Sequence, residues 1–162
     1  MTSVRKPRPR SRSAGILLYR RVSGGLQVLL VHPGGPIWAR RDLGAWSLPK
    51  GEYEIDEDPL AAARREFAEE LGSPAPDGET LDLGEIRQKS GKLVRAWAVG
   101  GDLDPERITS NEFEMEWPPR SGRRQRFPEV DRAQWFGLAD AREKINPAQA
   151  ALLDRLSEAV GP

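Results

Sequence analysis

The sequence contains no cysteine and only one histidine, His32, among its 162 residues. The absence of cysteine excludes a disulfide scaffold, a thiolate metal site and a cysteine nucleophile. A single histidine excludes a zinc site built from several imidazoles. Any metal bound by this chain must therefore be held mainly by oxygen ligands, which favours Mg²⁺, Mn²⁺ or Ca²⁺.

Long apolar runs are missing as well. No segment approaches the roughly 18–20 apolar residues that a membrane-spanning helix needs. The apolar stretch 14–19 is shorter than the core of a signal peptide, about 7–15 residues, and Arg20 and Arg21 follow it directly. We therefore expect a soluble, cytoplasmic protein without a membrane partner.

The chain has no net charge, because 25 Lys and Arg residues balance 25 Asp and Glu residues. A domain dedicated to nucleic-acid binding is usually basic, so nucleic acid is not the partner that we expect. The charges are nevertheless segregated, with five basic residues in 1–13 and eight acidic residues against two arginines in 52–70. We interpret residues 1–13 as a flexible basic arm, with phosphate contact as the alternative, and residues 14–162 as one domain.

Apolar runs at 14–21 and 26–32, separated by Ser-Gly-Gly, predict a β-hairpin. Further strands are predicted at 81–90, 93–99 and 132–136, and helices at 58–71, 138–145 and from Asn146 onward. Helices and strands are intermixed without a regular βαβ alternation. The pattern favours a mixed sheet flanked by helices, in the α/β or α+β class.

The clearest predicted helix covers residues 58–71. Asp58 is a suitable N-cap, Pro59 occupies the first helical position, and Gly72 follows the last turn. Apolar residues recur at spacings of three and four, as in a helix that packs on one face. This stripe consists of Leu60, Ala63, Phe67 and Leu71.

Three glutamates lie together on this helix. Glu66, Glu69 and Glu70 stand at positions i, i+3 and i+4, within roughly 100° of arc on one helix face. Like charges at i, i+4 cost about 0.2–0.5 kcal/mol, and the C-terminal end of the helix dipole disfavours anions. A divalent cation removes both penalties, because it binds carboxylate oxygens readily. A solvated acidic face is the alternative interpretation of this pattern.

Segment 51–72 resembles the Nudix box, G-x5-E-x7-R-E-U-x-E-E-x-G-U, in which U is a bulky apolar residue. The matching residues are Gly51, Glu57, Arg65, Glu66, Phe67, Glu69, Glu70 and Gly72. Only Ser73 departs, because it stands where the family prefers an apolar residue. The resemblance implies a Nudix-type α/β/α sandwich with a mixed sheet, in which the box forms a loop–helix–loop.

The resemblance also implies an activity, the hydrolysis of a nucleoside diphosphate linked to another moiety, with Mg²⁺ or Mn²⁺ as cofactor. Such hydrolysis requires neutralisation of clustered negative charge and activation of a water, which suits carboxylates that hold metal. From their positions in the box, Glu57 and Arg65 are expected to form an ion pair that holds the loop on the helix. Arg65 is also expected to orient a neighbouring glutamate.

By the same match, Glu66 and Glu70 are the expected main metal ligands, and the backbone carbonyl of Gly51 is a further ligand. Glu69 is expected to be a ligand or the base. Nudix enzymes often bring an additional carboxylate from outside the box to the metals, and Glu129 is the candidate here. Glu69 and Glu129 therefore compete for the role of the base, and a surface loop position is the alternative for Glu129.

Two stretches outside the box resemble the diadenosine polyphosphate hydrolase branch. Residues 46–51 resemble its W-x-x-P-K-G lead-in, and residues 129–138 resemble its acidic residue followed by a W-(L/F)-x-L strand end. This branch commonly has Pro-Gly where the present chain has Ile55 and Asp56. The resemblance favours a dinucleoside polyphosphate, such as diadenosine tetraphosphate, as the small-molecule substrate.

Basic residues suit a polyphosphate, because lysine and arginine are the usual partners of phosphate oxygens. The candidate phosphate contacts are Arg40, Arg41, Lys50 and Lys92. The candidate rings for stacking of a base are Trp38, Trp46, Tyr53 and Phe127. Segment 105–126 has the length of an insertion and is either a basic lid or a surface loop. The arginines that would make such a lid basic are Arg120, Arg123, Arg124 and Arg126.

The leading hypothesis is a Nudix pyrophosphohydrolase that acts on a nucleoside polyphosphate by in-line attack of a metal-activated water. One alternative is a house-cleaning nucleoside triphosphate pyrophosphatase. Another is a catalytically silent Nudix module that binds nucleotide or RNA, against which the intact set of Glu66, Glu69 and Glu70 argues. A monomer or a homodimer is expected.

Overall fold

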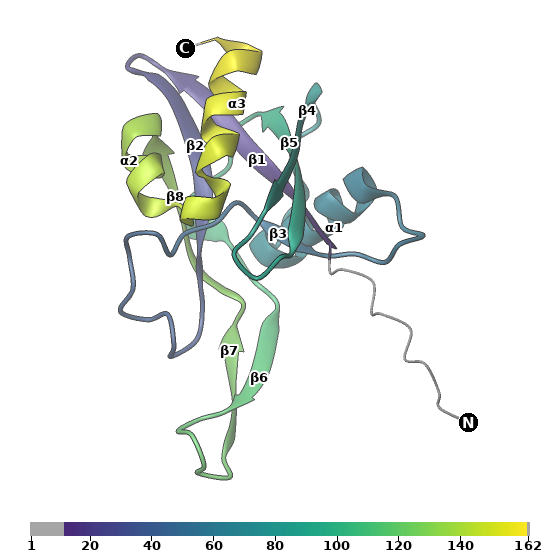
Figure 1. The fold of residues 1–162 in the computed structure, drawn as a ribbon. Coiled ribbons are helices and arrows are strands. Elements are labelled where there is room, and N and C mark those ends of the chain that lie inside the picture. The colour runs from purple at the N-terminus through teal and green to yellow at the C-terminus, as the bar shows by residue number, and fades with distance from the viewer. Residues whose placement is uncertain (1–11, 162) are drawn as a thin grey trace, which may run out of the picture.

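The computed structural model describes residues 12–161 (Figure 1). The strands are β1 (Arg12–Val22), β2 (Gly25–Pro33), β3 (Lys50–Glu52), β4 (Thr80–Arg87), β5 (Leu93–Gly100), β6 (Glu112–Glu116), β7 (Arg124–Pro128) and β8 (Val130–Gly137). The helices are α1 (Pro59–Leu71), α2 (Leu138–Lys144) and α3 (Ala150–Val160), with short 3₁₀ turns η1 (Pro105–Arg107) and η2 (Pro147–Gln149).

The first strand begins before the predicted domain boundary at Ala14. Arg12 and Ser13 belong to β1, where they pair with Leu93 and Val94 of β5. Residues 1–11 of the predicted basic arm lie outside the described residues.

Six strands form one mixed sheet in the order β4-β5-β1-β2-β8, and β3 also pairs with β1. β1 runs parallel to β5, whereas the other neighbouring strands are antiparallel. The β1–β2 hairpin closes with Val22 paired to Gly25, at the predicted Ser-Gly-Gly turn. The mixed sheet predicted from the sequence is confirmed.

Helices cover both faces of this sheet (Figure 1). On one face, Ile16 and Leu18 of β1 pack in the same core cluster as Phe67 of α1. On the other face, Leu17 belongs to a second cluster with Leu156 of α3. Burial of each such side chain stabilises the fold by about 1.5–3 kcal/mol. The alternating side chains of β1 thus hold the predicted α/β/α sandwich together.

Three residues determine where α1 begins and ends. The side chain of Asp58 accepts a hydrogen bond from the N–H of Ala61 at 3.0 Å, and Pro59 begins the helix. At the other end Gly72 has a left-handed backbone with φ of 77°, and its N–H donates to the carbonyl of Ala68 at 2.8 Å. The predicted helix is therefore confirmed at both ends.

The segment predicted as an insertion folds into a separate two-stranded hairpin, β6–β7, which projects away from the main sheet (Figure 1). Apolar and acidic residues alternate at 113–117 as in a strand, and β6 forms there. β7 lies where a loop is predicted, because its exposed Arg124, Gln125 and Arg126 show no apolar alternation. Pairing with β6, rather than local pattern, makes this segment a strand.

The last helix also begins later than predicted. Asn146 Oδ1 accepts a hydrogen bond from the N–H of Ala148 at 3.0 Å, so it caps η2. α3 begins only at Ala150, after that turn.

Substitution of Gly72 tests the cap of α1. A Cβ at position 72 would lie 2.6 Å from the carbonyl oxygen of Thr109, in addition to the backbone strain of a positive φ. Gly91 has a φ of 91° but no atom within 4 Å of its Cβ position, so it is a matched control. We expect Gly72→Ala to lower the free energy of unfolding in urea by about 1–3 kcal/mol more than Gly91→Ala does. Equal losses would contradict this account of the cap.

Candidate active site

Helix α1 and strand β3 meet at a glycine. A Cβ on Gly51 would lie 1.9 Å from Glu66 Oε2, so any other residue would collide with this carboxylate. The side chain of Glu66 is consequently only 12% exposed, whereas that of Glu69 is 39% exposed. Burial raises the pKa of Glu66, and the negative charge of Glu69 raises it further. The structure therefore brings Gly51 and Glu66 into contact and places Glu69 close enough for its charge to act on Glu66.

Arg65 ties the preceding loop to the helix. Its Nε donates to Glu57 Oε1 at 3.0 Å and its Nη2 donates to Glu57 Oε2 at 3.2 Å, which gives a bidentate pair. Its Nη1 donates to Glu66 Oε1 at 2.8 Å, and Glu69 lies 3.5 Å away. The hydrogen bonds from Arg65 lower the pKa of Glu57. One guanidinium thus contacts three of the acidic residues of the segment.

Glu70 differs from its neighbours because its carboxylate turns inward. Its Oε2 is buried and has no hydrogen-bond partner. Burial raises the pKa of Glu70 to about 8, against the opposing attraction of the Lys50 ammonium. Burial in turn lowers the pKa of Lys50. A buried acceptor oxygen without a donor is costly for the fold, and a cation would satisfy it.

A chain of backbone hydrogen bonds places Glu129 near the same helix end. The N–H of Asn111 donates to the carbonyl of Glu69 at 3.0 Å, and the N–H of Glu129 donates to the carbonyl of Asn111 at 2.8 Å. The N–H of Gly34 then donates to the carbonyl of Glu129 at 2.9 Å. Burial raises the pKa of Glu129, and the charges of Glu66 and Glu69 raise it further. Glu129 is therefore part of the acidic group, although it lies far from it in sequence.

Glu70 and Glu129 border one cavity of about 470 Å³. Its remaining walls come from the loop 33–38 and from β6. The arrangement combines carboxylates, a nearby lysine and an open cavity, which suits the binding of a cation together with a phosphorylated ligand.

A family model described as the NUDIX domain matches residues 9–156 of this chain. The chain belongs to the NUDIX family. It is therefore a Nudix hydrolase, a class of enzymes that cleave pyrophosphate bonds.

Curated relatives and solved structures agree with this assignment. An RNA pyrophosphohydrolase of Gluconacetobacter diazotrophicus is 28% identical over 156 residues, which cover 84% of this chain and 82% of that protein. An RNA pyrophosphohydrolase of Rhodospirillum rubrum is 37% identical over 70 residues, which cover 41% of this chain and only 40% of that protein. The crystal structure of a C. elegans Ap4A hydrolase binary complex shares the fold, with a TM-score of 0.64. That match is 22% identical and covers 91% of this chain and 97% of the other.

The acidic residues suit a divalent metal by their chemistry. Glu70 Oε2 is a buried oxygen without a partner, and Glu66 lies against the backbone of Gly51. Among residues 12–161, however, no three acidic or imidazole side chains converge on one point as ligands. The Glu66 carboxylate is instead paired with Arg65, whose Nη1 lies 2.8 Å from Glu66 Oε1. An ion would therefore have to compete with Arg65 for Glu66.

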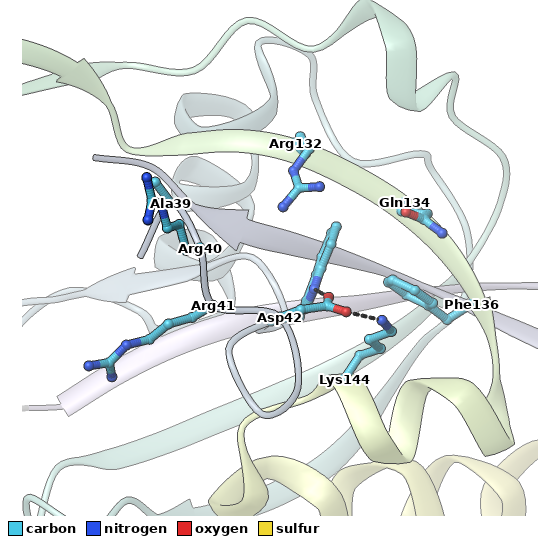
Figure 2. A pocket seen from close by; sticks show the side chains of 9 residues that line it. Ala39, Arg40, Arg41, Asp42, Arg132, Gln134, Phe136 and Lys144 are labelled. Carbon is cyan, nitrogen blue, oxygen red and sulfur yellow. Dashed lines mark hydrogen bonds and ion pairs between the residues drawn. The ribbon is translucent and has the colours of Figure 1, made fainter. Parts of the chain in front are cut away.

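The predicted substrate residues fall into two groups. Arg40, Arg41 and Trp46 line a second pocket of about 380 Å³, together with Arg132 and Lys144 (Figure 2). Figure 2 shows Arg132 pointing from β8 into this pocket, while Lys144 pairs with Asp42. The pocket opens on the sheet face that α2 and α3 cover, since Trp46 and Phe136 belong to that core cluster.

Trp46 lies at the bottom of this second pocket, and most of its side chain is buried beneath the other lining residues. Its side chain packs edge-on against His32 and Phe136, and its N–H donates to Asp42 Oδ1 at 2.8 Å. The residue is only 2% exposed, and the Arg132 guanidinium lies 5.2 Å from its ring centroid. This burial leaves the ring no open face on which a base could stack.

The other predicted contacts lie near the glutamates. Lys50 is on β3 beside Glu70, and Lys92 Nζ lies 2.8 Å from Glu52 Oε1. Tyr53 packs against the core cluster beneath α1 and is half-buried. Of the predicted cations, Lys50 is therefore the one whose charge acts directly on a proposed metal ligand.

Sequence reasoning missed the apolar residues that border the large cavity. Ile37, Phe113 and Met115 line it beside Glu70 and Glu129. The alternation in β6 does indicate that Phe113 and Met115 share one face. It gives no indication that the hairpin turns this face toward the active site, because hydrogen bonds between distant segments determine that orientation.

In the part of the chain that the structure describes, no helix combines the length and the apolar character needed to cross a bilayer.

The Glu57–Arg65 pair leads to a pH-dependent prediction for stability. Because the folded pKa of Glu57 lies below its ordinary value, the pair stabilises the fold above that value and loses its effect as pH falls through the folded pKa. We expect Glu57→Gln to lower the thermal midpoint at pH 7, and this deficit to shrink below about pH 4. Thermal unfolding monitored by circular dichroism from pH 3 to 7 measures the midpoint and its dependence on pH. Glu158→Gln, at an exposed position of α3, is the control, and a deficit that is constant from pH 3 to 7 would contradict the prediction.

Proposed function

We propose that this protein is a metal-dependent pyrophosphohydrolase that cleaves a phosphoanhydride bond in a nucleoside polyphosphate, with dinucleoside polyphosphates as favoured substrates. The observation that carries the proposal is the buried Glu70 oxygen without a partner, close to the charges of Glu66 and Glu129. Such a concentration of carboxylates is unfavourable without a cation and useful with one.

Glu66 and Glu70 would hold Mg²⁺ or Mn²⁺, with Glu69 and the carbonyl of Gly51 as further ligands. A bound divalent metal neutralises phosphate charge and lowers the pKa of a coordinated water. Arg65 orients Glu66 through its 2.8 Å hydrogen bond, and Glu57 in turn holds Arg65. Glu69 and Glu129 are the two candidates for the base that would accept a proton from the attacking water, and the attack would be in line with the leaving phosphate.

The distribution of cations supports a substrate with several phosphates. Lys50 lies at the glutamates, whereas Arg40, Arg41, Arg132 and Lys144 surround the second pocket. The segment 33–46 contributes to both cavities. Because one segment lines two separate pockets, we infer a ligand with a nucleoside at each end of its phosphate chain. A dinucleoside polyphosphate is therefore favoured over a nucleoside triphosphate. A cytoplasmic location and a monomeric or homodimeric state stay predictions.

Glutamine substitutions test the metal ligands. We expect Glu70→Gln and Glu66→Gln each to reduce kcat by more than about 100-fold, because even partners of metal ligands contribute 10- to 100-fold. The circular dichroism spectrum should stay that of the wild type, since glutamine keeps the side-chain volume. Glu158→Gln is the matched control and should keep full activity. Full activity of Glu66→Gln or Glu70→Gln would refute the ligand assignment.

A substrate panel tests the favoured class. Diadenosine tetraphosphate, nucleoside triphosphates and a 5′-triphosphorylated RNA are incubated with Mg²⁺ or Mn²⁺ in ¹⁸O-water, and the products are separated. We expect the highest kcat/KM for the dinucleoside tetraphosphate, with ¹⁸O in one product at the attacked phosphorus. Preferred release of pyrophosphate from a triphosphate would instead support the house-cleaning alternative. Tight RNA binding without any metal-dependent hydrolysis would support the silent module.

A further inference from the structure

The cavity beside Glu70 and Glu129 has an apolar side that the metal chemistry does not use. This side is formed by residues 33–38 and by strand β6 of the β6–β7 hairpin. The apolar side chains that line it are Ile37, Trp38, Phe113 and Met115. Ile37 and Trp38 are 54% and 37% exposed, which is unusual for residues of this size.

Close backbone contacts hold the two walls together. A Cβ on Gly34 would lie 1.9 Å from the carbonyl oxygen of Pro128, and a Cβ on Gly35 would lie 2.9 Å from Cζ of Phe113. The N–H of Gly34 also donates to the carbonyl of Glu129 at 2.9 Å. Only glycines permit this approach, so the slot between loop and hairpin is preformed and fixed relative to Glu129.

The hairpin keeps its charges away from this slot. Because side chains alternate along a strand, Glu114 and Arg126 lie on the face opposite to Phe113 and Met115, and they are paired across the strands. Arg124 Nε lies 3.7 Å from Glu114 Oε2 on that outer face. None of the residues that line the slot is a lysine or an arginine. The slot therefore suits an uncharged planar group, and the basic-lid interpretation of this hairpin loses support.

We propose that this slot binds the nucleobase of the substrate, stacked on Phe113 and Trp38, while the phosphates lie at the glutamates. The proposal rests on the function proposed above and names the residues that recognise the base. The Arg41 guanidinium lies 5.3 Å from the centroid of the Trp38 ring, within the range of a cation–π contact. Stacking of one base on an aromatic side chain is sequence-tolerant and accounts for about 5- to 150-fold in affinity.

The test is a binding measurement that does not depend on turnover. Calorimetry in Mg²⁺ compares α,β-methylene ATP, which resists cleavage between its α and β phosphates, with methylenediphosphonate, which has no base. The variants are Phe113→Ala, Trp38→Ala and Phe113→Leu, which keeps apolar volume without the ring. Arg126→Gln, on the outer face of the same hairpin, is the matched control.

We expect the wild type to bind the nucleotide analogue at least about 10-fold more tightly than methylenediphosphonate. All three slot variants should weaken the analogue at least about fivefold and leave methylenediphosphonate unchanged, while Arg126→Gln changes neither. Equal binding of the two probes by the wild type would overturn the proposal. Equal losses of affinity for both probes in Phe113→Leu would also overturn it. A loss of affinity in Arg126→Gln as large as that in Phe113→Ala would do the same. Base-dependent binding without hydrolysis of any nucleotide would leave the slot standing and refute the proposed function.

Discussion

The burial of the Glu70 carboxylate is the constraint on which the rest of the site depends. Ionisation of Glu70 is costly because one of its two carboxylate oxygens is buried without a hydrogen-bond partner, and the nearby charges of Glu66 and Glu129 increase that cost. Lys50 offsets only part of it, because burial also disfavours its ammonium. The sandwich holds these groups in place through the close contact between α1 and β3 at Gly51. The fold thereby holds a buried carboxylate oxygen that a bound cation would satisfy.

The backbone couples this acidic group to the cavity that Glu70 and Glu129 border. The hydrogen bonds that join Glu69 to Asn111, Asn111 to Glu129, and Glu129 to Gly34 run from the end of α1 to the loop 33–38. They position Glu129 among the carboxylates and also fix the point where the β6–β7 hairpin joins the rest of the chain. One set of main-chain contacts therefore determines both the acidic side and the apolar side of the cavity. Side chains on the two sides differ sharply in polarity, as the proposed ligand with phosphates and a planar base would require.

Much of this architecture follows from the sequence, but its long-range parts do not. Local signals at Asp58, Pro59 and Gly72 predict α1, and the box spacing places Gly51, Glu57 and Arg65 around it. By contrast, β7 is polar and becomes a strand only through its partner β6. The burial of Trp46 likewise depends on β8 and on His32, which no local pattern reveals. Sequence reasoning therefore predicts the positions of the residues around α1 more completely than the shape of the cavity.

The most direct test of this account is a titration of metal into the nucleotide-free protein. Mn²⁺ is followed by electron paramagnetic resonance in the wild type, Glu70→Gln and Glu158→Gln. The account predicts that the wild type and Glu158→Gln bind Mn²⁺ with the same affinity, and that Glu70→Gln binds it at least about 10-fold more weakly. Equal Mn²⁺ affinity in all three proteins would contradict the claim that the buried Glu70 carboxylate exists to hold a cation.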